Sequence, residues 1–145
     1  MKKILCLTLA LLAMIACLTS CNFNFTGSGL TTETETTAKV EAMMTALATS
    51  KKSDALALIH ANATEKADGS IDQMIEFIDG RRVSSMELTG INVTSSAGSN
   101  GNMRQEQVSY RVALSDGSTI YLTAVYLSNN LGEGFVSFQI VLGMI

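Results

Sequence analysis

The chain has 145 residues, a net charge of −3 and three cysteines, all at or before position 21. Beyond that position no disulfide can form within the chain, so a domain there must be stabilised by packing. The mildly acidic composition lacks the clustered Lys and Arg that nucleic acids attract, and it predicts no nucleic-acid partner.

The N-terminus has the parts of an export signal. Two lysines follow Met1, residues 4–16 form an apolar run too short to span a membrane, and Leu-Thr-Ser-Cys stands at 18–21. This segment resembles the lipobox of bacterial lipoproteins. The resemblance implies that the thiol of Cys21 receives a diacylglyceryl group with acyl chains such as palmitate, and that residues 1–20 are removed. The alternative is an uncleaved N-terminal helix.

We therefore expect three segments. Residues 1–20 are the signal peptide, 21–34 are the lipidated cysteine and a flexible tether, and 35–145 are one α+β domain. Without the signal the chain has eight basic and thirteen acidic residues, a charge of −5. The lipid would then supply the attachment to the cell membrane or the outer membrane, on its extracytoplasmic side.

Apolar residues at helical spacing predict three helices. The first, over about 35–49, carries Val40, Met43, Met44 and Leu47 at i, i+3, i+4 and i+7. Ser53 is the expected N-cap of a short second helix that stops near Ala63. A capping box at 70–73 predicts the start of the third helix, and Gly80 its end.

From Arg81 onward the apolar period changes to two, which predicts strands. Met86 and Leu88 alternate out of step with the apolar residues that follow, so we expect a β-bulge at Thr89-Gly90. Residues 95–102 are rich in Gly, Ser and Asn and predict a loop. A last strand is expected over about 135–142, with an inward row of Val136, Phe138, Ile140 and Leu142.

The central hairpin has two apolar rows, which select its turn. One row is Val108, Tyr110 and Val112, and the other is Ile120, Leu122, Ala124 and Tyr126. A two-residue Asp116-Gly117 loop would put these rows on opposite faces, whereas a three-residue loop, 115–117, puts them on one face. We therefore predict the three-residue turn, with Gly117 at positive φ.

Three helices followed by a four-stranded antiparallel meander predict an α+β fold with a curved, cone-like sheet. This order, with Ser53-Asp54-Ala55-Leu56 in a helix and residues 75–80 running into the first strand, resembles the nuclear-transport-factor-two-like, or cystatin-like, fold. It is similar to small bacterial lipoproteins of unknown function over about 35–142. We expect the inner face to be filled by Met43, Met44, Met74, Met86 and Phe138.

The resemblance implies that an enzyme of this superfamily, such as an isomerase or dehydratase, would place an acid or base with Tyr or His inside the cone. The polar candidates are Tyr110, Tyr126 and His60. The tyrosines also suit a core or rim position, and His60 suits a helix end. A lone histidine is a poor metal-ligand set, so no metal and no cofactor are expected. Asp72, Glu76 and Asp79 form an acidic strip on the third helix, which Arg81-Arg82 would partly neutralise.

The sequence thus favours a membrane-anchored, non-catalytic module that binds a small apolar ligand or an envelope protein. The alternatives are a small enzyme that uses the cone pocket and a homodimeric scaffold. For the scaffold, the contact face would be the outward row that includes Arg111, Tyr121, Thr123 and Val125.

Overall fold

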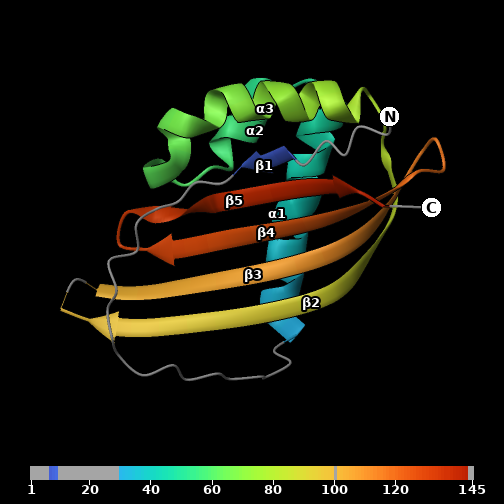
Figure 1. The fold of residues 1–145 in the computed structure, drawn as a ribbon. Coiled ribbons are helices and arrows are strands. Elements are labelled where there is room, and N and C mark those ends of the chain that lie inside the picture. The colour runs from blue at the N-terminus through green and yellow to red at the C-terminus, as the bar shows by residue number, and fades with distance from the viewer. Residues whose placement is uncertain (1–6, 10–29, 100, 144–145) are drawn as a thin grey trace.

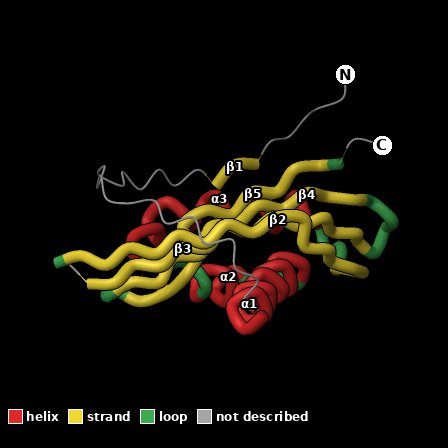
Figure 2. The backbone as a smooth tube through the Cα atoms, turned by 90° about the horizontal axis from the view of Figure 1, so that it is seen from below, coloured by secondary structure: helices red, strands yellow, loops and turns green. Residues whose placement is uncertain are grey.

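The computed structural model describes residues 7–9, 30–99 and 101–143. Cys21, the predicted cleavage site and most of the predicted tether lie outside these ranges. The described chain folds as α+β, with helices packed on one face of a curved sheet (Figures 1 and 2). The helices are α1 (Leu30–Ala48), α2 (Lys52–Ala57), the single 3-10 turn η1 (Ala61–Ala63) and α3 (Thr64–Ile78).

The sheet is antiparallel throughout, in the order β1-β5-β4-β3-β2. Its strands are β1 (Leu7–Leu9), β2 (Val83–Gly98), β3 (Gly101–Leu114), β4 (Thr119–Asn129) and β5 (Gly132–Leu142). The predicted four-stranded meander is confirmed as β2 to β5. The short strand β1 was not predicted: it comes from the predicted signal peptide and pairs with the outer edge of β5.

The helix bounds differ from the prediction at three N-termini and at the end of α2, which stops at Ala57 rather than near Ala63. α1 begins at Leu30, so residues 30–34 are helical rather than part of a tether. Lys51, not Ser53, holds the N-cap position of α2. α3 begins at Thr64, so the prediction that a capping box at Ser70 starts this helix was wrong. The helix extends further because Ala67, which is fully buried, continues its apolar stripe one turn before Ser70.

Both predictions on the hairpin geometry are confirmed. The pairing of β2 with β3 shifts between Leu88 and Gly90, which is the predicted bulge. Val112 pairs with Ile120, and Gly117 has φ +83°, as a three-residue turn requires. The apolar rows of β3 and β4 therefore share the face that packs on the helices.

Two strand predictions were wrong. Residues 95–98 and 101–102 are strand rather than loop, because β2 and β3 pair as far as Gly98 and Gly101. In β5 a further bulge, opposite Val125 and Tyr126, pairs Phe135 rather than Val136 with Tyr126. Phe135 is fully buried, and its ring centroid lies 5.1 Å from that of Tyr126 and 5.3 Å from that of Phe138.

The core lies between α1, α3 and the concave face of the sheet. The predicted stripe on α1 is buried, and so are Met43, Met44, Met74 and Phe138, while Met86 is half-buried against the same cluster. Gly80 adopts φ +72° after Asp79 at φ +48°, which confirms the predicted end of α3.

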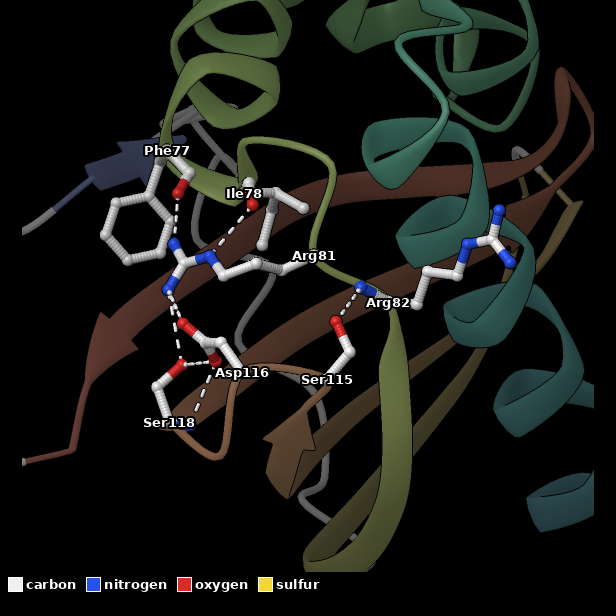
Figure 3. A network of polar contacts seen from close by, with 7 residues as sticks. All are labelled: Phe77, Ile78, Arg81, Arg82, Ser115, Asp116 and Ser118. Atoms are coloured by element: carbon white, nitrogen blue, oxygen red, sulfur yellow. Dashed lines mark hydrogen bonds and ion pairs between the residues drawn. The ribbon is translucent and has the colours of Figure 1, made fainter.

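Arg81 fastens the end of α3 to the β3–β4 turn (Figure 3). Its Nε donates to the Ile78 carbonyl oxygen at 2.9 Å, and Nη2 donates to the carbonyl of Phe77. Nη1 reaches Ser118 Oγ at 3.2 Å and the Asp116 carboxylate at 3.4 Å. Hydrogen bonds from Ser118, helped by the Arg81 charge, lower the pKa of Asp116.

The acidic strip on α3 is engaged by a different cation from the one predicted. Lys52 Nζ lies 2.7 Å from Asp72 and 3.0 Å from Asp68, which ties α2 to α3. These hydrogen bonds raise the pKa of Lys52. The prediction that Arg81-Arg82 partly neutralises the strip was wrong for Arg81, because its guanidinium pairs with Asp116 in the turn.

Candidate functional site

A buried carboxylate lies on the helix side of β3. Glu106 is only 6% exposed and stands two residues before Val108, so it belongs to the inward row. One carboxylate oxygen accepts a hydrogen bond from the Thr36 hydroxyl of α1. The other lies 2.7 Å from Arg104 Nε. Both oxygens of this carboxylate are thus held within the chain, and we call Thr36, Arg104 and Glu106 the Glu106 cluster.

Glu106 was not predicted, and only the two tyrosines were expected as polar residues of the inward row. The signal was present in the parity of β3, because the row through Val108 and Tyr110 continues backward to positions 106 and 104. Position 106 already lay beyond the loop predicted over 95–102; Glu106 was missed because the inward row was followed only through its apolar members and tyrosine, from Val108 onward.

The structure brings Tyr110 and Tyr126 to the same inward face as Glu106. Tyr126 is the register partner of Glu106 on β4. The Tyr110 hydroxyl lies 2.8 Å from Thr37 Oγ1 of α1. Both tyrosines are buried, so they serve as core residues whose rings pack between the sheet and the helices.

His60 lies elsewhere, at the start of η1, and is fully buried. Its Nδ1 accepts a hydrogen bond from the backbone N–H of Asn62 at 3.2 Å, which leaves Nε2 to donate to Asn129 Oδ1 at 3.1 Å. Asn129 Oδ1 also accepts from the Leu131 N–H. His60 therefore joins η1 to the β4–β5 turn.

The segment around His60 also pairs with β5. Phe135 N–H donates to the Leu58 carbonyl at 2.8 Å, and His60 N–H donates to the Phe135 carbonyl at 3.0 Å. Ile59 and Phe135 thus form a parallel bridge at the edge of the sheet. Gly134 makes this approach feasible, since a Cβ built on it would lie 2.4 Å from His60 N.

An open depression of about 440 Å³ lies at the free end of the β2–β3 hairpin. Its lining consists of Ser95, Ser96, Ala97, Asn102, Met103, Arg104 and Ser128. Arg104 belongs both to this depression and to the Glu106 cluster. Arg104 therefore links this depression to the buried carboxylate.

The opposite face of the sheet carries the residues predicted for a dimer contact. Arg111 is the register partner of Tyr121, which is 49% exposed, and the row continues to Glu87 on β2 and Val141 on β5. Thr123 and Val125 follow along β4, half-buried, with Thr123 Oγ1 3.3 Å from Ser109 Oγ. We call the row of Glu87, Arg111, Tyr121 and Val141 the outer row.

Among the described residues, no group of three His, Cys, Asp or Glu side chains is placed to hold a metal ion. Comparison with protein-family models, curated proteins and solved structures found no match. None of the helices within the described ranges combines the length and apolarity needed to cross a membrane. The site must therefore be interpreted from the geometry of the chain.

Proposed function

We propose that this protein is a lipid-anchored, extracytoplasmic interaction module, with a fold of the nuclear-transport-factor-two-like type. The lipobox at Cys21 supports the anchor, and the curved sheet around α1 supports the fold type. The module binds another envelope protein through the outer face of its sheet.

The observation that carries the binding role is the outer row. It runs across four strands, and its middle holds an arginine beside a half-exposed tyrosine. Tyr and Arg are the residue types that contribute most at protein interfaces, because each combines apolar area with a polar group. A partner that covers Tyr121 and Arg111 would bury apolar area and form polar contacts at the same time.

The inner face of the sheet is a poorer candidate for binding than the outer face, and proton transfer there has the least support. A general base needs an atom within reach of its substrate. The oxygens of Glu106 are engaged by a hydrogen bond from Thr36 and an ion pair with Arg104. Both ring nitrogens of His60 form hydrogen bonds within the chain, so these groups already have partners. The methionines and Phe138 fill the space beside them.

The anchor is tested by cell fractionation. Once residues 1–20 have been removed, a Cys21→Ser chain should leave the membrane fraction and keep the urea midpoint of the wild type. Wild-type protein should stay with the membrane. A processed Cys21→Ser chain that remained membrane-bound would contradict the anchor.

The binding face is tested by photocrosslinking in cells. The photoreactive residue p-benzoylphenylalanine is placed at Tyr121 and, as a control, at exposed Gln73 of α3. We expect an adduct with an envelope protein from position 121 and a clearly weaker one, or none, from position 73. An adduct of twice the chain mass would instead favour a homodimeric scaffold, and equal adducts from both positions would contradict a specific face.

A further inference from the structure

The outer edge of β5 is occupied by two other segments of the chain. Leu58–His60 pairs at Phe135. β1 pairs with the stretch Phe138–Ile140, antiparallel, at the other end of the same edge (Figure 1). No charge, proline or glycine occurs in residues 136–142, Val-Ser-Phe-Gln-Ile-Val-Leu.

Such an edge is exposed to pairing with other chains unless something protects it. Proteins usually protect an edge strand with lysine, proline or a bulge, or by covering it. In β5 the stretch 136–142 has none of the protecting side chains, so its protection at Phe138–Ile140 comes from β1.

β1 lies within residues 1–20, the segment that the proposed processing at Cys21 removes. This inference therefore rests on the proposed function. Removal of Leu7–Leu9 leaves the outward backbone groups of Phe138–Ile140 without their strand partner. An open strand edge presents a row of unpaired N–H and C=O groups that can pair with another chain, so the freed edge favours binding of a new strand.

We propose that processing opens the β5 edge as a docking site for an extended segment of another envelope protein, which adds antiparallel to β5 in place of β1. The register of β1 defines the chemistry of that segment. Leu7 is opposite Ile140, Thr8 is opposite Gln139, and Leu9 is opposite Phe138. An apolar–polar–apolar triplet therefore fits this edge, because Phe138 and Ile140 belong to the buried row and Gln139 to the outward row.

A single strand fits this edge better than a second copy of the chain. α3 contacts β1 and so borders the position of the incoming strand. In a two-fold pair of β5 edges, the second copy would bring its own α3 to the same side. Two copies of α3 would then compete for the space beside the joined edge, because packed helices need about 8–10 Å between their axes.

The test uses processed wild-type protein purified from membranes in detergent, after its intact mass has been measured. The probe is a fluorescent peptide carrying residues 4–12 with a lysine added at each end. The matched control has the same side chains but is N-methylated at the three positions that correspond to Leu7, Thr8 and Leu9, so it cannot donate backbone hydrogen bonds there. Binding is followed by anisotropy, and hydrogen exchange of residues 136–142 is followed by mass spectrometry.

We expect the probe to bind at least about tenfold more tightly than the control and to slow exchange of residues 136–142 at least about tenfold, as a loss of two or more backbone hydrogen bonds implies. Equal binding of the two peptides, or no change in exchange, would overturn the docking edge. A dimer whose residues 136–142 are protected before peptide is added would also overturn it. An intact mass that includes residues 1–20 would show that the proposed processing fails. The mass alone therefore distinguishes failure of the processing from failure of the docking edge.

Discussion

Replacing Gly134 with alanine should strongly destabilise the fold, because this glycine lies against backbone rather than against a flexible side chain. A Cβ at position 134 would be 2.4 Å from His60 N, 2.7 Å from His60 Cα and 2.7 Å from the Ile59 carbonyl carbon, whereas ordinary contact begins at 3.4 Å. The two segments must therefore separate by 1.0 Å (3.4 − 2.4).

This separation would break the parallel bridge. Its hydrogen bonds, 2.8 Å from Phe135 N to the Leu58 carbonyl and 3.0 Å from His60 N to the Phe135 carbonyl, would lengthen by up to about 1 Å, beyond ordinary hydrogen-bonding distance. Two lost hydrogen bonds cost about 1 kcal/mol each, and the forced shift of a packed core adds about 1–3 kcal/mol. We therefore expect Gly134→Ala to lower the free energy of unfolding by about 3–5 kcal/mol.

Urea unfolding measured by circular dichroism checks this value. With a slope of about 1.5 kcal/mol per molar urea, the midpoint should fall by about 2–3 M. Gly69→Ala in α3 is the matched control, because no atom lies within 4 Å of its Cβ, and a helical glycine-to-alanine change should stabilise by about 0.5–1 kcal/mol. A loss below about 0.5 kcal/mol for Gly134→Ala, within the range of ordinary surface substitutions, would refute the close approach of these segments.

Three further changes test individual contacts by the same unfolding assay. His60→Ala should cost about 2–4 kcal/mol, because it leaves a cavity and removes two side-chain hydrogen bonds; an unchanged midpoint would contradict the joining role. Because the pKa of Lys52 is raised, its ammonium group stabilises the fold at pH values below the unfolded pKa of 10.5. As the pH rises through the folded pKa above 10.5, wild type should therefore lose more stability than Lys52→Met. Lys51→Met is the control, and parallel curves for wild type and Lys52→Met would contradict the pairing. Because the pKa of Asp116 is lowered, its carboxylate stabilises the fold above pH 3.8, and this stabilisation is lost as the pH falls through the folded pKa below 3.8. Asp116→Asn should therefore make the decrease in the free energy of unfolding at acid pH less steep. An equally steep loss in both proteins would contradict that contact.

The sequence predicted those features that depend on the alternation of buried side chains. The bulge before Gly90 and the three-residue turn ending at Gly117 both follow from the requirement that apolar rows face one core. The end of α3 followed from a residue type, since Gly80 tolerates positive φ.

The features that were missed depend on backbone pairing or on distant segments. Residues 95–98 and 101–102 pair as strands although they carry no apolar row, because the ladder of β2 and β3 is formed by backbone hydrogen bonds and these side chains are mostly exposed. β1 could not be predicted, because its partner β5 lies more than a hundred residues away and its own apolar run indicates an export signal. The inward position of Glu106 followed from the alternation of β3, but the row was followed only from Val108 onward.

The intact mass of the protein extracted from membranes tests the central claim most directly, because the anchor and the opening of β5 both depend on cleavage before Cys21. The account predicts a chain of residues 21–145 carrying added acyl mass on its first residue. A chain that retains residues 1–20, or one with an unmodified Cys21, would contradict it.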